Sequence, residues 1–242
     1  MRQLTRPASP TKLINNERKR RLYENLKDEA GNIRPRWNTL VEGGARVVRD
    51  AVRSISNDCC CFCGVKVLDS KMDIDHYLPS SKFPYLAYCW ENLIPTCKQC
   101  NQTFKNDFFP NSLSELEIIE SCMEGCLTCH HIYNQDLIME LSKNDRIIDP
   151  SYDNVNDHLE FNPEFYLYNV KTPIGINTNK MFFDRDEVVR HLEGISNITK
   201  KFVINGCSKD VLDDIINLYG QEFYYHAFFD YWVEEQAAGR LR

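Results

Sequence analysis

Apolar residues recur at helical spacing over much of the C-terminal third of the chain. Between Val188 and Ile195 they fall three or four positions apart, and Asp184 with Glu187 fits a capping box just before them. A second helix is expected to begin after Ser208. The pattern predicts a mainly helical region at this end of the chain.

The helical pattern continues beyond Gly220 as a stripe rich in aromatic residues that reaches Trp232. A stripe of this kind usually packs into the core of its own chain. Aromatic side chains are also enriched at the buried centres of protein interfaces, so docking of residues 113–242 onto a partner is the alternative. The sequence pattern fits both interpretations.

Shorter patterns predict the rest of the fold. Residues 15–27 and 37–55 contain no proline and mix apolar with charged positions, which favours helices. Residues 73–75 alternate polar and apolar as a half-buried strand does, and residues 90–95 suit the returning strand. We therefore expect a mostly helical α+β chain in three regions, which are a partly helical N-terminal arm (1–57), a central module (58–112) and a mainly helical C-terminal region (113–242).

Composition narrows the class of protein. The chain is 43% hydrophobic, which argues against wholesale disorder. It has no apolar run near 18 residues, and its first residues hold no apolar stretch of signal-peptide length. We therefore expect a cytoplasmic protein with no membrane span. In that reducing compartment, eleven cysteines indicate metal binding or core packing rather than disulfides.

Charge is distributed unevenly. Residues 1–57 carry thirteen Lys/Arg and six Asp/Glu, whereas the remainder carries sixteen and twenty-nine. A basic arm on an acidic body suits contact with a phosphate backbone through the arm, and an ordinary solvated face explains the same charges. Because residues 58–242 are acidic and would repel a phosphate backbone, a partner is expected to contribute to any binding of nucleic acid.

Two close cysteine pairs form the strongest metal signal. Cys60 and Cys63 form one CxxC, and Cys97 and Cys100 form another 33 residues further on. Two such pairs are what a tetrahedral zinc site needs, and zinc binding would brace the module between them. Neighbouring cysteines at positions 59 and 61 are alternative ligands in the first pair.

A further cluster lies outside this module. It consists of Cys122, Cys126, Cys129 and His130, followed by His131. A second metal site and a metal-free, cysteine-rich turn both fit this spacing.

The residues between the cysteine pairs suit phosphodiester hydrolysis. A neutral histidine such as His76 can take a proton from the attacking water. Asp75 and Asn101 can offer oxygens to Mg²⁺ or Mn²⁺, which needs few protein ligands. Asn92 is expected to hold His76 by accepting its other ring N–H. Lys105, one helical turn after Asn101, is expected to touch the phosphate.

This ordered set strongly resembles the HNH nucleases of the ββα-metal class. In that family the order is a first zinc pair, a metal aspartate with the general-base histidine, a middle asparagine, a second zinc pair and a final metal ligand. The matching positions here are Cys60 and Cys63, Asp75 and His76, Asn92, Cys97 and Cys100, and Asn101. The last position is often histidine in the family. The resemblance implies a ββα-metal module with structural zinc and catalytic Mg²⁺ or Mn²⁺, and it covers about a fifth of the chain.

A narrower resemblance extends beyond the motif. Residues 1–2, 81–86, 90–93, 148–153 and 158–161 look like the PtuB-like HNH subunits of Septu and retron-linked anti-phage systems. That resemblance implies a DNA-cleaving subunit of a bacterial defence complex with a PtuA-like ATPase of the SMC/ABC kind. A retron RNA/DNA element is a further partner that it suggests.

Two other functions use the same residues. A nuclease acting on structured RNA such as tRNA needs the same chemistry, although no known RNA-binding module is visible. A zinc-knuckle binding module without catalysis is the other alternative. The presence of His76 together with Asp75 and Asn101 argues against it.

Overall fold

The computed structural model describes residues 1, 3–14, 16–37, 40–42, 46–68, 71–114 and 135–241. In chain order these residues form α1 (Thr11–Ile14), α2 (Asn16–Glu24), α3 (Val47–Ile55), β1 (Met72–His76), the 3₁₀ turns η3 (Pro84–Leu86) and η4 (Trp90–Asn92), β2 (Leu93–Cys97), the π-helix η5 (Gln99–Lys105), the 3₁₀ turn η6 (Asn111–Leu113), α6 (Gln135–Leu141), α7 (Val155–His158), β3 (Leu159–Asn162), β4 (Leu167–Val170), α8 (Pro173–Phe182), α9 (Asp186–Ile204), α10 (Lys209–Tyr219) and α11 (Glu222–Ala237). Helices predominate and the strands form two separate pairs, so the mostly helical α+β class is confirmed for the part described. Among the described helices, none combines the length and the apolar character that crossing a membrane requires.

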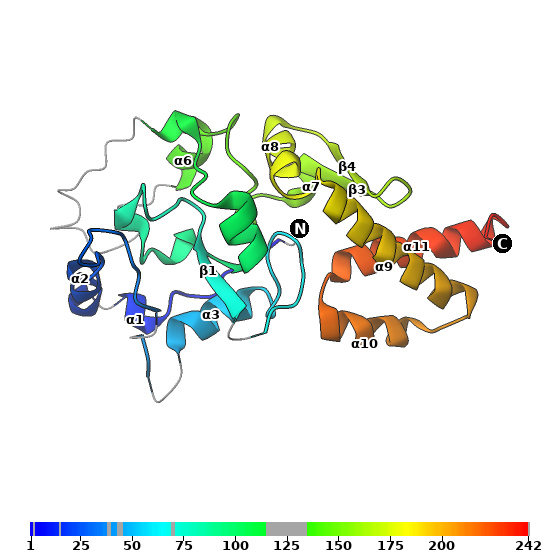
Figure 1. Cartoon of the computed structure of the whole chain (residues 1–242), viewed down its shortest axis with the longest axis horizontal. Coiled ribbons are helices and arrows are strands. Elements are labelled where there is room, and N and C mark those ends of the chain that lie inside the picture. The colour runs from blue at the N-terminus through cyan, green and yellow to red at the C-terminus, as the bar shows by residue number, and fades with distance from the viewer. Residues whose placement is uncertain are drawn as a thin grey trace.

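The pair β1–β2 is the centre of the first half of the molecule (Figure 1). The strands run antiparallel, with Asp75 opposite Ile94 and His76 opposite Leu93. Residues 73–75 lie in β1 as expected, and β2 begins at Leu93 because Trp90–Asn92 turns into the strand as η4. The chain passes almost directly from β2 into η5, which contacts β2.

Two clusters of buried side chains meet at this hairpin. The first joins α1 and α3 to the hairpin through residues such as Leu13, Val48 and Ile74. The second runs from the cysteine-rich turn through α8 to the C-terminal helices, and in it Phe62 stacks on Phe182 with ring centroids 4.1 Å apart. Because burial of apolar surface is the main force for association, the C-terminal region is held firmly on the central module.

The aromatic stripe beyond Gly220 lies on α11 and packs mostly inward. Tyr224 and Phe228 are buried, and α11 packs against α9. The indole Nε1 of Trp232 donates a hydrogen bond to the Ser196 carbonyl at 3.1 Å. Packing into the chain's own core therefore accounts for most of this stripe.

One expected helix is shorter than its pattern suggested. Only Val47–Ile55 of the range 37–55 is α-helix among the described residues. The sequence pair Gly43-Gly44 precedes it, and each glycine costs a helix about 1 kcal/mol relative to alanine.

The start of α9 also differs from the expectation. The N-cap is Arg185 rather than Asp184, and no side chain caps the helix there. The Asp184 N–H instead donates to the Asn179 carbonyl at the end of α8. The predicted capping box is wrong because Asp184 belongs to the turn that leaves the preceding helix. The helix predicted after Ser208 is confirmed as α10.

Residues 147–150, which overlap the stretch 148–153 of the narrower resemblance, are bonded both to the central module and to the N-terminal arm. The Tyr77 hydroxyl donates to the carbonyl of Ile147 at 2.7 Å. The Leu4 N–H donates to the carbonyl of Pro150 at 2.7 Å. These bonds anchor both the N-terminal arm and the turn that follows His76.

Candidate active site and metal centre

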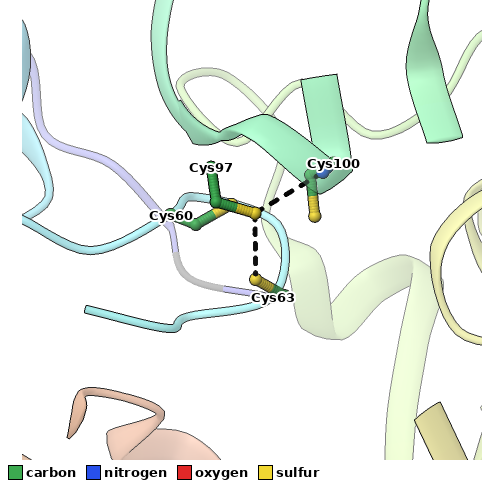
Figure 2. Close-up of side chains that lie close together, drawn as sticks. All are labelled: Cys60, Cys63, Cys97 and Cys100. Carbon is green, nitrogen blue, oxygen red and sulfur yellow. Dashed lines mark hydrogen bonds between the residues drawn. The ribbon is translucent and has the colours of Figure 1, made fainter. Parts of the chain in front are cut away.

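Four cysteines from two distant parts of the sequence meet at one point (Figure 2). The sulfur atoms of Cys60, Cys63, Cys97 and Cys100 lie within 4.8 Å of one another, and those of Cys63 and Cys97 are 3.8 Å apart. Four sulfurs at about 2.3 Å from a tetrahedral zinc ion are about 3.8 Å from each other. The donor set and its spacing therefore fit structural zinc.

The first CxxC turn depends on a glycine. Gly64 has a φ of 75° and donates its N–H to the Cys60 carbonyl at 2.9 Å. This left-handed conformation is strained for residues with a Cβ atom. In the second pair, the Cys100 N–H donates to the Cys97 sulfur at 3.4 Å, as donors around a thiolate ligand do.

The first cysteine turn is also bonded to the C-terminal region. The Gln221 N–H donates to the Gly64 carbonyl at 2.7 Å, and the Lys66 N–H donates to the Tyr219 carbonyl at 2.9 Å. Gly220 sits between these bonds, where an added Cβ would lie 2.4 Å from the Gly64 oxygen. The α10–α11 junction is thus built directly onto the cysteine turn.

Of the three possible first ligands, Cys60 is the one in the sulfur cluster. The Cys61 side chain is fully buried, and burial raises the pKa of its thiol well above the ordinary value. Cys59 is buried, and its thiol lies 3.5 Å from the Asn57 carbonyl. The second expected cluster, from Cys122 to His130, lies outside the described residues.

A hollow of about 170 Å³ opens beside the end of β1. Asp75, His76 and Asn101 all line it, together with Ser80 and Gln102. The strand end and the first turn of η5 therefore bring the sequence-predicted base and both predicted metal ligands to one concave surface.

His76 is held as a neutral imidazole. Its Nε2 lies 2.9 Å from the Ala87 carbonyl, and because a carbonyl only accepts, Nε2 must carry the ring proton. Nδ1 is then the nitrogen with the free lone pair. Burial lowers the pKa of His76 to about 4, and the Trp37 ring lies against it with centroids 5.9 Å apart.

Asp75 is paired with Lys105 inside the protein. The Lys105 ammonium donates to Oδ1 of Asp75 at 3.1 Å and to the His76 carbonyl at 2.7 Å. Burial raises the pKa of Asp75, and the Lys105 charge opposes that rise. Asp75 Oδ2 is buried without a hydrogen-bond partner, an arrangement that a bound cation would satisfy.

Lys105 therefore differs from its expected role. Its side chain is 0% exposed, and it donates hydrogen bonds to Asp75 and to the His76 carbonyl. Lys105 therefore holds Asp75 from inside the protein and does not extend toward a phosphate. Asn101 and Lys105 do share a helix face as expected, because both bond to side chains of β1.

Asn92 is also placed differently from its expected role. Its Oδ1 accepts from the Leu78 N–H at 2.8 Å, and its Nδ2 donates to the Leu78 carbonyl at 2.9 Å. Its hydrogen bonds thus go to the turn after the strand, while the Ala87 carbonyl holds His76. Asn92 is fully buried, and its hydrogen bonds fix the backbone of the turn that follows His76.

Asp73 is a site residue that the sequence reasoning missed. It accepts hydrogen bonds from Asn101 Nδ2 at 3.1 Å and from Gln102 Nε2 at 3.0 Å, both through its Oδ2. The signal was present in the strand pattern, because residues two apart in a strand share a face. Asp73 and Asp75 therefore both face η5.

Part of the sequence is similar to known proteins. Residues 60–107 match the HNH endonuclease family model, and the chain resembles Septu protein PtuB. It is 33% identical over 103 residues to Septu protein PtuB of Bacillus thuringiensis, an alignment that covers 42% of this chain and 36% of that protein. It is 30% identical over 109 residues to Protein ea31 of Escherichia phage lambda, covering 43% and 32%.

The chain thus spans about a third of the length of these relatives. No solved structure matches it.

Proposed function

We propose that the chain is a metal-dependent HNH endonuclease that hydrolyses phosphodiester bonds. The observation that carries this proposal is the meeting of Asp75, His76 and Asn101 around one hollow, next to a four-sulfur cluster. The match of residues 60–107 to the HNH endonuclease family supports it.

His76 acts as the general base in this proposal. Its Nε2–H donates a hydrogen bond to the Ala87 carbonyl, so the lone pair of Nδ1 can take a proton from a water molecule. The low pKa keeps the ring neutral at physiological pH, which is the form that a base needs. Asn92 contributes by fixing the turn that begins at Tyr77.

Asp75 and Asn101 are proposed to hold the catalytic Mg²⁺ or Mn²⁺ ion. The unpartnered Oδ2 of Asp75 and the amide oxygen of Asn101 are hard oxygen donors, the type that these ions prefer. When bound, such an ion stabilises negative charge on the phosphate and on the leaving oxygen. Zinc at the cysteine cluster has a structural role because four cysteines leave it no open position.

We further propose that the substrate is DNA and that the chain is the nuclease subunit of a bacterial anti-phage complex with an SMC/ABC-type ATPase. The similarity to Septu protein PtuB supports this assignment. The acidic balance of residues 58–242 also favours a partner that helps to recruit a polyanion. A retron RNA/DNA element is a further component to be tested in the same complex.

The proposal is tested with full-length protein, alone and with a candidate PtuA-like ATPase. We expect cleavage of plasmid or linear DNA with Mg²⁺ or Mn²⁺ and none after EDTA, because the metal supplies the charge stabilisation. Cleavage of structured RNA but not DNA would reassign the substrate. A folded, zinc-loaded protein that cleaves neither substrate, with or without the ATPase, would contradict the nuclease assignment.

The ATPase is proposed to dock on the outer face of α10. Val211 and Leu218 lie two helical turns apart on this helix and are 42% and 70% exposed, and the adjacent Tyr219 is 61% exposed. Leu212 is buried, and Ile215 and Ile216 pack partly against the core, so the proposed surface consists of the exposed positions alone.

Removing residues 208–242 would not test this docking cleanly, because α11 supplies core residues such as Phe228. The sharper change is Leu218→Asp with Tyr219→Asp, which leaves the core intact. We expect co-purification with the ATPase to fall at least about tenfold, as for central interface residues. Phe165→Asp, at a 59% exposed position in the β3–β4 turn, is the matched control and should not weaken it. Equal co-purification of all three proteins would exclude the α10 face.

A further inference from the structure

Two side-chain pairs connect β1 to η5 in parallel. Asp73 of the strand bonds Asn101 of the helix, and two residues later Asp75 bonds Lys105 one turn further on. Residues two apart in a strand share a face, and residues about one turn apart in a helix share a face. The two pairs therefore join one face of β1 to one face of η5. Each of the two proposed metal ligands therefore has one side-chain atom already committed to a neighbour.

The pair with Asp73 determines how the Asn101 amide is oriented. A carboxylate oxygen only accepts hydrogen bonds, so the group that faces Asp73 Oδ2 at 3.1 Å must be the amide nitrogen. The amide oxygen of Asn101 is then the atom left for a cation. In the opposite orientation, two oxygens would face each other and the NH₂ group would meet the ion.

Asp73 itself does not line the hollow, whereas Asn101, Asp75 and His76 do. It has a second hydrogen bond from Gln102, which fixes the same carboxylate oxygen. Its geometry is therefore that of a residue acting through Asn101, not that of a ligand.

We propose that Asp73 is a positioning residue for the catalytic metal, because it holds the Asn101 amide with its oxygen available to the ion. The inference rests on the proposed function, since it takes Asn101 as a metal ligand. Lys105 does the corresponding work for Asp75 by occupying Oδ1 and leaving Oδ2 without a partner. Asp73 is the residue to test, since removing Lys105 would leave a buried carboxylate unpaired.

The test measures Mn²⁺ binding to the full-length, zinc-loaded protein by calorimetric titration, together with the Mn²⁺ dependence of cleavage. Asp73→Ala should weaken Mn²⁺ binding about 10- to 100-fold, as loss of a partner to a metal ligand does. It should raise the Mn²⁺ concentration needed for half-maximal cleavage by a similar factor, while saturating Mn²⁺ restores most of the rate. Asp73→Asn keeps a side-chain oxygen that accepts from Asn101, so it should bind Mn²⁺ nearly as the parent does.

Asp145→Ala is the matched control, because Asp145 is another aspartate that accepts two hydrogen bonds, here from the N–H and Oγ of Ser112, and it does not line the hollow. It should stay within about threefold of the parent, since an exposed hydrogen bond contributes little. Zinc content and melting temperature report whether each variant is folded. If Asp73→Ala folds poorly, Asp73→Ser serves instead, since its side chain is too short to reach the amide.

Parental Mn²⁺ affinity in a folded Asp73→Ala protein would overturn the inference while leaving the nuclease assignment intact. An equal loss in Asp73→Asn and Asp73→Ala would also overturn it, because charge rather than amide orientation would then be responsible. A folded parent protein that neither binds Mn²⁺ nor cleaves nucleic acid would instead remove the proposed function, and this inference with it.

Discussion

Replacing His76 with alanine is expected to reduce cleavage by about 10²- to 10⁴-fold, the usual contribution of a general base. The physical reason is the fixed tautomer. Nε2 is tied to the Ala87 carbonyl, and only the Nδ1 lone pair remains to accept a proton. The measurement is the single-turnover cleavage rate at saturating Mg²⁺ or Mn²⁺, so that metal affinity does not enter the comparison.

The controls separate lost chemistry from lost packing. The His76 ring contacts Trp37, so alanine removes some packing as well as the base. His76→Asn keeps an amide that can donate to Ala87 but cannot take a proton near neutral pH, and it should be as inactive as the alanine variant. His226→Ala, on α11 and outside the hollow, is the matched histidine control and should cleave normally. A folded His76→Ala protein that cleaves at the parental rate would show that His76 is not the base.

The sequence predicts those parts of the candidate site that depend on patterns of a few neighbouring residues. The Asp73-Ile74-Asp75 alternation predicted a strand, and β1 contains it. Two CxxC pairs predicted one four-sulfur cluster, and the sulfurs do meet. These predictions succeed because the strand repeat and the knuckle turn depend on a few adjacent residues.

The helix α8 shows a local signal that was overlooked. Thr172 and Pro173 form a standard helix start, with the Thr172 hydroxyl accepting from the Gly175 N–H at 3.1 Å and proline in the first turn. The pair β3–β4 was missed as well, and its four-residue strands are too short for a clear alternation to emerge.

The roles of Asn92 and Lys105 depend on tertiary structure. Their spacing identified polar groups near the base, but it carried no information on which donor would meet which acceptor. Asn92, the last residue of η4, bonds the Leu78 backbone, and Lys105, the last residue of η5, is buried against Asp75 of β1. The role of Asp73 also depends on tertiary structure, because its hydrogen bond with Asn101 joins the strand to the helix.

Zinc loss is expected to have the largest effect on folding. Binding of structural zinc contributes about 10–16 kcal/mol in small zinc modules, which is comparable to or larger than the roughly 5–15 kcal/mol stability of a whole domain. Cys97→Ser or Cys100→Ser should therefore give insoluble or unfolded protein. Purified parent protein should contain about one zinc per chain if this cluster is the only site, as measured by elemental analysis.

The effect should extend beyond the central module, because the first cysteine turn carries the α10–α11 junction. Bonds from Gln221 to Gly64 and from Lys66 to Tyr219 depend on the shape of that turn. Stripping zinc with a strong chelator should therefore increase amide hydrogen exchange in residues 209–237 as well as in 60–67. Cys207→Ser, outside the sulfur cluster, is the matched control and should keep its zinc and its protection.

Two results would change the assignment of the metal sites. Zinc content near two per chain would assign a second ion to the cluster of Cys122, Cys126, Cys129 and His130. A soluble, active Cys97→Ser protein without zinc would refute the structural role of the metal. Cys59→Ser tests the ligand assignment in the first pair: the structure places Cys60 in the cluster, so this variant should keep its zinc, and loss of zinc would mean that Cys59 is the ligand.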